Sequence, residues 1–175
     1  MDFEKEISEN KIVLLTINRE NYHRDIIKAI GLISKSCSRI CYICVNDPYS
    51  FVSSSLEKSQ LNPKGMFFID TITKKVQAPP PSDNCIFVSA PNSLTEINLA
   101  FSKAVSEQHC DCTFFDSLSS IMIYDNAHSI VQFIHNMLTK LRISNGRAFF
   151  VALKDDSGSE LVKDLYMFVD KAIEI

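Results

Sequence analysis

The chain has 175 residues, of which 46% are hydrophobic and 22% are charged, proportions typical of a soluble globular protein. This composition excludes the disordered and fibrous classes. The 18 basic and 21 acidic residues give a net charge of −3, and no basic run is longer than Lys74-Lys75. The charge balance therefore disfavours nucleic acid and an anionic membrane surface as partners.

No apolar stretch reaches the length of about 18 residues that a membrane span needs, and the N-terminus is acidic and polar, unlike a signal peptide. We therefore expect a cytoplasmic protein that does not associate with a membrane. The six cysteines lie mostly in or beside apolar runs, and a chain of this length needs no disulfide framework. We expect them to be reduced and mostly buried.

Short apolar runs recur along the chain, at 12–17, 40–45, 66–69, 85–88, 112–115 and 148–153. They are too short for helices, and their continuous apolarity predicts strands that are covered on both faces, as in a parallel sheet. Segments 22–36 and 127–143 have the periodicity of amphipathic helices. The final segment repeats this pattern through Leu161, Leu165, Phe168 and Ala172, which predicts a last helix.

Local signals mark where several elements begin and end. Asp47-Pro48 has the composition of a helix N-cap followed by the first helical residue, and the segment from Ser93 to Glu96 has that of a capping box. Asn145-Gly146 predicts a helix stop. The triple proline within 71–84 predicts an exposed loop or a small edge element, because proline cannot occupy a central strand or a helix interior.

Alternating strands and helices predict one domain over 1–175, with an N-terminal extension at 1–10. Its fold is a three-layer α/β/α sandwich around a mostly parallel sheet. Ligands bind outside the carboxyl ends of the strands in such folds. The residues expected at that edge are Asn18, Arg19, Glu20, Asn46, Asp47, Asp70, Ser89, Asp116, Ser117 and Lys154.

A nucleotide site in this fold needs a glycine-rich turn after the first strand, because glycine lets backbone amides close on phosphate oxygens. The turn from Asn18 to His23 contains no glycine, and the four glycines are far apart in the sequence. No Gly-Lys-Ser/Thr occurs anywhere in the chain. The phosphate-binding loop and the dinucleotide fingerprint are therefore both absent.

The fifth apolar run ends in Asp116, Ser117, Leu118 and Ser119, an acid and hydroxyls of the kind that hold Mg²⁺ in P-loop ATPases. This stretch resembles the Walker B strand of the KaiC-like branch of the RecA superfamily. The resemblance extends over residues 11–175 and implies a RecA-like P-loop NTPase topology. The former phosphate-loop region is then Asn18, Arg19, Glu20 and Asn21, without its Walker A motif. The whole chain is similar to uncharacterised archaeal proteins that keep this fold and have lost the P-loop.

Several of the acidic residues have two interpretations. Asp116 either caps the helix that begins at Ser117 or is a retained cation ligand, and a weak Mg²⁺ site is the metal-binding alternative. Asp47 is either a helix cap or a shortened form of the family's catalytic carboxylate. Asp70 is either a strand-end acid facing water or a phosphoacceptor or metal ligand.

Other constellations of reactive residues give little support for a site. Cys41 and Cys44 point to opposite faces of one strand, so joint zinc ligation with Cys37 is disfavoured. Cys110 and Cys112 share a face if both belong to the strand, but no second pair accompanies them. His128 and His135 are about 10 Å apart along a predicted helix, too far for a shared ion.

The leading hypothesis is a non-catalytic RecA-like domain without a cofactor. It would bind an unknown protein partner or self-associate, as a signalling or regulatory module. The first alternative is an atypical nucleotide-binding protein or ATPase that holds Mg²⁺ and ATP through Asp116 and grips phosphate with Arg19, Arg24 or Lys154. The second alternative is a receiver-like domain in which Asp70 accepts a phosphoryl group beside Ser89 and Lys154. That trio lacks its acidic pair, since only Glu20 lies nearby.

Overall fold

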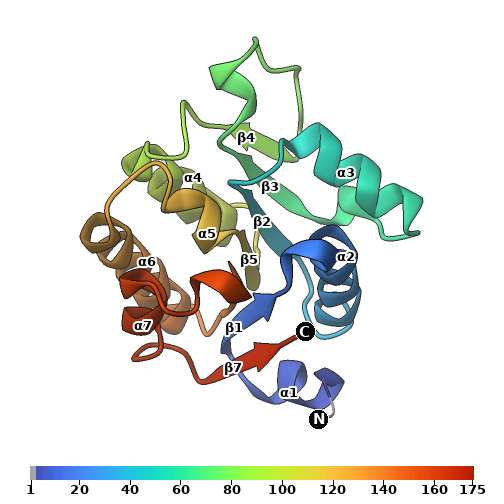
Figure 1. Cartoon of the computed structure of the whole chain (residues 1–175). Helices are drawn as coiled ribbons and strands as arrows, with labels where there is room; N and C mark the ends of the chain where they lie inside the picture. The colour runs from blue at the N-terminus through green and yellow to red at the C-terminus, as the bar shows by residue number, and fades with distance from the viewer. Residues whose placement is uncertain (1–2) are drawn as a thin grey trace.

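Seven parallel strands form one sheet within residues 3–175, the part of the chain that this computed structural model describes (Figure 1). The spatial order is β4-β3-β2-β5-β6-β1-β7. The strands are β1 (Ile12–Ile17), β2 (Ile40–Cys44), β3 (Phe67–Asp70), β4 (Cys85–Phe87), β5 (Cys112–Asp116), β6 (Arg147–Leu153) and β7 (Lys171–Glu174). Each neighbouring pair is parallel, so the predicted α/β class is confirmed, with a sheet that is parallel throughout these strands.

Helices cover both faces of the sheet. They are α1 (Phe3–Glu9), α2 (Tyr22–Ile33), α3 (Tyr49–Lys58), α4 (Leu94–Ser106), α5 (Leu118–Ile121), α6 (Ala127–Ile143) and α7 (Glu160–Leu165). Short 3₁₀ helices occur at Arg19–Asn21, Pro63–Gly65, Thr73–Lys75 and Lys154–Asp156. None of the helices within residues 3–175 has both the length and the apolarity to cross a membrane.

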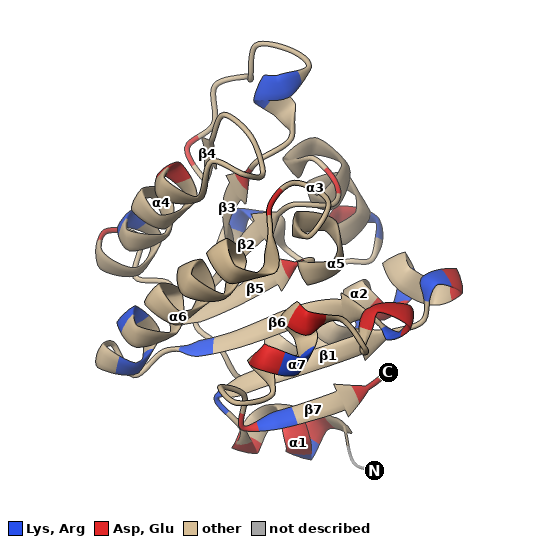
Figure 2. Ribbon diagram, turned by 60° about the vertical axis from the view of Figure 1, so that its left-hand side comes forward, with Lys and Arg blue, Asp and Glu red and all other residues tan. Residues whose placement is uncertain are grey.

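Two apolar cores lie on opposite faces of the sheet. Side chains of α1, α2 and α3 pack on one face, and those of α4, α5, α6 and α7 pack on the other. Along β1, Val13 and Leu15 enter the first core and Leu14 enters the second, and all three are fully buried. This double burial explains why the strand sequences are continuously apolar. Charged residues of both signs are spread over helices, loops and the ends of strands (Figure 2).

The C-terminal segment differs from the predicted helix. Helix α7 ends at Leu165, and the chain then forms β7, which pairs with β1 at the edge of the sheet. The Asp170 carboxylate accepts hydrogen bonds from the backbone amides of Lys11 and Ile12 at 3.1 and 2.8 Å, which fixes the entry to this strand. The strand buries Ile173 in the core and makes ladder hydrogen bonds, and these outweigh the local helical pattern.

The N-terminal extension also has structure. Residues 3–9 form α1, whose Ile7 is buried against the core, and Lys171 of β7 pairs with Glu6 at 3.2 Å. Residues 1 and 2 of the expected extension lie outside the described residues.

One predicted helix cap is wrong, and another has the predicted position without the predicted hydrogen bonds. Helix α3 begins at Tyr49, and Pro48 rather than Asp47 occupies its N-cap position. Ser93 is the N-cap of α4 but makes no capping hydrogen bond through its side chain. The Glu96 carboxylate instead accepts hydrogen bonds from the backbone amide and hydroxyl of Ser89. The capping box is therefore not formed, and Glu96 instead bonds α4 to Ser89 in the loop after β4.

The predicted helix stop and the proline-rich excursion are both present. Helix α6 ends at Ile143, and Asn145 takes the left-handed conformation with φ of 58°. Segment 71–84 projects from the molecule as the green loop above β4 in Figure 1. Its residues 74–78 are exposed, whereas Thr71 and Thr73 at its start are buried.

Candidate functional site

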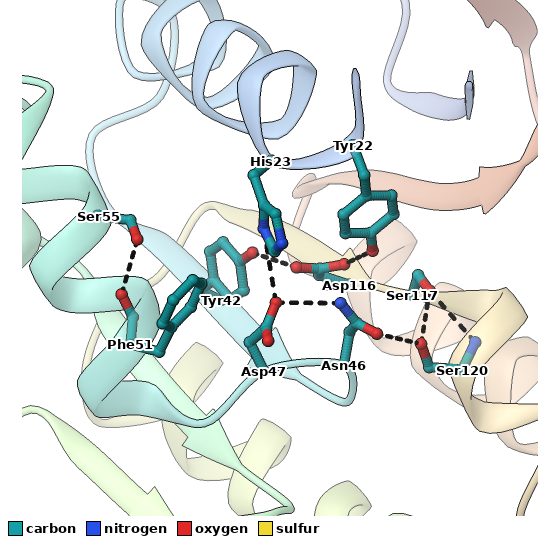
Figure 3. Close-up of polar contacts among 10 residues, drawn as sticks. All are labelled: Tyr22, His23, Tyr42, Asn46, Asp47, Phe51, Ser55, Asp116, Ser117 and Ser120. Carbon is teal, nitrogen blue, oxygen red and sulfur yellow. Dashed lines mark hydrogen bonds and ion pairs between the residues drawn. The ribbon is translucent and has the colours of Figure 1, made fainter. Parts of the chain in front are cut away.

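The carboxyl ends of β2 and β5 lie side by side and bring together polar residues from several elements (Figure 3). In the sheet register, Asp116 is the partner of Cys44. The backbone oxygen of Asp116 accepts hydrogen bonds from the amides of Val45 and Asn46 at 2.7 and 3.1 Å. These bonds hold the loop after β2 against the end of β5. The peptide bond between Asp116 and Ser117 is cis.

The Asp116 carboxylate is enclosed by two tyrosines. Its Oδ1 accepts a hydrogen bond from the Tyr22 hydroxyl, and its Oδ2 accepts one from the Tyr42 hydroxyl. Only 2% of the residue is exposed, and burial raises the pKa of the carboxyl group to about 6. Hydrogen bonds from the two tyrosines oppose this rise because they favour the ionised form. We call Tyr22, Tyr42 and Asp116 the Asp116 triad.

Both tyrosines are positioned by their surroundings. Burial raises the pKa of each hydroxyl, and the adjacent Asp116 raises it further, so both remain protonated donors. The Tyr42 ring packs between Phe68 and Phe114, with centroid distances of 5.8 and 5.2 Å. Tyr22 is the first residue of α2, directly after the turn that follows β1. The ring of Tyr22 therefore reaches the triad from the end of the turn that follows β1.

A chain of hydrogen bonds runs beside the triad. Ser117 caps α5 by accepting a bond from the Ser120 amide at 3.2 Å, and the Ser120 hydroxyl donates to Asn46 Oδ1 at 3.0 Å. Asn46 Nδ2 donates to Asp47 Oδ2 at 3.0 Å. His23 Nδ1 lies 3.7 Å from the same carboxylate oxygen. The network links α5 to α2 across the carboxyl edge of the sheet. Asp47 contacts Asn46 and His23 at this edge and does not cap a helix.

The space next to the triad is small. A cavity of about 20 Å³ is lined by Tyr42, Asp116 and side chains of α2 and α3. It has room for about one water molecule. Phe51 lies at its opening with 47% of its surface exposed, and its ring meets the His23 ring edge to face at 5.4 Å. A nucleotide does not fit in this cavity.

The turn that the sequence predicts to be a former phosphate-loop region contains a short 3₁₀ helix, Arg19–Asn21, preceded by Asn18. Asn18, Arg19 and Glu20 are exposed, and Asn21 is half-buried. Arg19 lies 3.8 Å from the carboxylate of Asp155. None of these side chains takes part in the Asp116 triad.

Asp70 is fully buried, so the expectation that it faces water is wrong. Its Oδ1 accepts from the amides of Ile72 and Thr73 at 2.7 and 2.8 Å. Its Oδ2 accepts from the Tyr49 amide at 2.8 Å and the Thr73 hydroxyl at 2.6 Å. Asp70, although far from α3 in the sequence, thus caps the N-terminus of this helix. It also fixes the backbone at the start of segment 71–84. The helix-capping role that the sequence assigns to Asp47 is performed by this residue.

Asp70, Ser89 and Lys154 have separate partners. Ser89 is bonded to Glu96, and Lys154 forms an ion pair with Glu174. Both oxygens of Asp70 are already occupied by protein donors. The structure therefore gives no arrangement in which these three residues share one phosphoryl group.

Cysteines and histidines do not gather into a metal centre in the described part of the chain, where no group of three or more potential ligands occurs. All six thiols are free. Cys41 and Cys44 enter opposite cores, as predicted. Cys110 and Cys112 also enter opposite cores, because β5 begins only at Cys112.

Sequence reasoning missed the two tyrosines of the triad. One signal was available for Tyr42, since a tyrosine inside a buried strand needs a partner for its hydroxyl. The nearest acid at the end of a neighbouring strand is Asp116, which the sequence analysis had already singled out. No comparable signal pointed to Tyr22, because its contact depends on the path of the turn after β1.

Comparisons with known proteins identify the fold. No protein-family model matches the sequence. No curated protein matches it either. Among solved structures, the chain is similar to a KaiC-like protein from the hyperthermophilic archaeon Pyrococcus horikoshii, with a TM-score of 0.62 and 11% sequence identity. The match covers 94% of this chain and 70% of that protein. The chain therefore has a KaiC-like, RecA-type α/β fold.

Proposed function

We propose that this chain is a RecA-like domain that has lost its phosphate-binding loop and acts by binding another protein or a second copy of itself. In this role it is a signalling or regulatory module without a cofactor. The observation that carries the proposal is the Asp116 triad. Each oxygen of this carboxylate accepts a tyrosine hydroxyl and only 2% of the residue is exposed, so a hydrated Mg²⁺ ion reaches it only if the tyrosines move.

The cations near the carboxyl edge support the same proposal. A nucleotide site without a P-loop would need Arg19, Arg24 or Lys154 to neutralise phosphate. Arg24 Nε lies 3.1 Å from the carboxylate of its neighbour Asp25, and Arg19 and Lys154 also have carboxylate partners. Each cation is thus directed to an acid of the protein itself.

The test is thermal unfolding with and without Mg²⁺-ATP and Mg²⁺-ADP. A ligand at 100 times its Kd stabilises the native state by about 2.7 kcal/mol, which raises the Tm of a domain this size by roughly 5 to 10 °C. We expect no rise at millimolar nucleotide. A rise that requires Mg²⁺ and disappears in Asp116→Ala would overturn the proposal in favour of an atypical ATPase.

A second variant tests whether the hydrogen bond from Tyr22 to Asp116 is by itself what prevents nucleotide binding. Tyr22→Phe removes the hydroxyl that occupies Asp116 Oδ1 and leaves the ring in place. We expect this variant also to show no nucleotide-dependent rise, since the cavity remains small and no phosphate loop is created. Phosphodonor treatment tests the receiver-like alternative, for which an acyl phosphate that disappears in Asp70→Asn would be required.

A further inference from the structure

Cys37, Cys112 and Arg147 meet at the edge of the sheet opposite the Asp116 triad. Cys112 is the first residue of β5, and its register partners are Ile40 of β2 and Arg147 of β6. Cys37 lies in the connection between α2 and β2, three residues before Ile40. The two thiols interact closely enough that contact with Cys112 lowers the pKa of Cys37, and contact with Cys37 raises that of Cys112.

The guanidinium of Arg147 is held beside the Cys37 sulfur. Arg147 Nη1 donates to Cys37 Sγ at 3.6 Å and to the Ser36 hydroxyl at 2.8 Å. Arg147 Nη2 donates to the backbone oxygens of Ile7 and Asn10. Four contacts therefore fix the positive charge next to the thiol. Contact with Cys112, to which Arg147 and Ser36 add, lowers the pKa of Cys37 and favours its thiolate.

Small molecules have a route to Cys37. The residue is half-buried and lines a cavity of about 250 Å³ between the C-terminal ends of α2 and α3. The other lining residues include Ser34, Ser38, Gln60 and Asn62, and none of the lining residues is charged. A neutral oxidant can enter such a cavity without a charge penalty. Cys112 is fully buried, so only Cys37 is open to this route.

We propose that Cys37 is a site of reversible oxidation by hydroperoxides and that Cys112 resolves the product as an intramolecular disulfide. In the first step the Cys37 thiolate attacks the peroxide, forming an S–O bond and breaking the O–O bond. The leaving alkoxide takes a proton and departs as an alcohol, or as water from hydrogen peroxide. In the second step the Cys112 sulfur attacks the sulfenic acid and forms the S–S bond. Hydroxide leaves and departs as water with the Cys112 proton, so the peroxide is the two-electron acceptor.

A second thiol pair in the same molecule is a matched control. Cys41 and Cys110 lie together in the opposite core, and contact between the two thiols raises the pKa of Cys41. Contact with Cys41 lowers the pKa of Cys110 as well, but Cys110 is buried with 5% of its surface exposed. Access to peroxide, rather than thiolate character, therefore separates the two pairs.

The experiment uses the full chain, first reduced with a dithiol and then exposed to graded hydrogen peroxide. Free thiols are alkylated after unfolding, and intact mass and peptide mapping locate the product. We expect the intact mass before alkylation to fall by two hydrogen atoms per chain. Mapping after alkylation should show a linked peptide containing Cys37 and Cys112, with full recovery of both thiols on renewed reduction. Cys41 and Cys110 should remain alkylatable over the same exposure.

Two variants identify the roles of the sulfurs. Cys37→Ser, at a half-buried position outside the regular elements, should abolish the mass loss. Cys112→Ala should leave the sulfenic acid of Cys37 unresolved, to be captured by a cyclic 1,3-dione. The wild-type result decides the matter if Cys112→Ala does not fold. A Cys41–Cys110 bridge forming as early as the Cys37–Cys112 bridge, or Cys37 remaining fully alkylatable at peroxide doses that oxidise a free thiol peptide, would overturn the proposal.

Discussion

The carboxylate of Asp116 loses most of its hydration on folding, and two hydroxyl donors replace only part of it. The pKa of this group is about 6 in the folded chain, against an ordinary value of 3.8. The native state therefore holds the proton more tightly than the unfolded chain between these pH values. The contribution of Asp116 to the free energy of unfolding is greatest below pH 3.8, falls as the pH rises to about 6, and is constant above that.

Replacing Asp116 with asparagine tests this dependence. Asparagine keeps the shape, can accept from one tyrosine and donate to the other, and has no charge to bury. We expect Asp116→Asn to be more stable than the wild type near neutral pH by up to about 3 kcal/mol, with the advantage disappearing toward about pH 4. Urea unfolding of both proteins across this range measures the difference. Asp83→Asn, at an exposed loop position, is the control, and a pH-independent difference for Asp116→Asn would contradict the assignment.

Asp70 illustrates a buried acid with a structural role. Its two oxygens accept four hydrogen bonds, three of them from backbone amides around the end of β3. Asp70→Ala leaves these donors without a partner in a site that is closed to solvent. We expect a loss of about 3 to 5 kcal/mol in the free energy of unfolding, measured with urea. Asp83→Ala should change the stability by less than about 0.5 kcal/mol, and an equally small change for Asp70→Ala would disprove this role.

At the scale of elements, periodicity identified six strands and the long helix α6, whose bounds match the predicted 127–143. Those elements have a sequence pattern that agrees with their burial. Strand β7 was missed because Leu165 and Phe168 continue a helical spacing, while the pairing that decides the outcome involves β1, far away in the sequence. The capping box failed for a similar reason, since Ser89 competes for the Glu96 carboxylate.

The turn between α6 and β6 leaves no room for an added methyl group at Gly146. A Cβ there would lie 2.8 Å from Leu141 Cδ2 and 3.4 Å from the backbone oxygen of Asp111. Leu141 is fully buried, so its side chain has little freedom to move. We expect Gly146→Ala to lower the free energy of unfolding by about 1 to 3 kcal/mol. Gly158→Ala, where a Cβ meets nothing within 4 Å, should leave thermal and urea unfolding nearly unchanged, and equal effects would contradict the packing argument.

At the scale of the whole molecule, segment 71–84 is the part that departs most from the layered fold (Figure 1). It contains Lys74 and Lys75, exposed beside a run of exposed residues that ends at Ala78. Exposed loop tips are preferred sites of proteolysis. We expect limited trypsin digestion to cut first after Lys74 or Lys75, as followed by intact mass.

The two fragments should remain associated, because β3 and β4 on either side of the cut belong to the same sheet. Replacing both lysines with glutamine should remove the early cut and leave later cuts unchanged. An earlier cut within the helices would show that the loop is better protected than its exposure indicates.

The sequence also predicts the carboxyl edge of the sheet and the position of Asp116 on it. It could not supply the partners of Asp116, because hydrogen bonds between residues 94 and 74 positions apart depend on how the strands are ordered. Likewise, the separate partners of Ser89 and Lys154 follow from the packing of α4 and β7. The sequence therefore predicts which residues lie at the carboxyl edge of the sheet, but it does not predict which of them form hydrogen bonds or ion pairs with one another.

The position of Tyr22 has a consequence for the history of such a chain. Under the proposed function, mutation could restore glycines and a lysine after β1, yet the tyrosine ring would still occupy the approach to Asp116. Removing the ring first would leave a buried acid with one donor fewer, at a cost in stability before any benefit in binding. Each single step back is thus unfavourable on its own. Under the proposed function, the Tyr22 side chain thus makes the loss of a nucleotide site difficult to reverse through single substitutions.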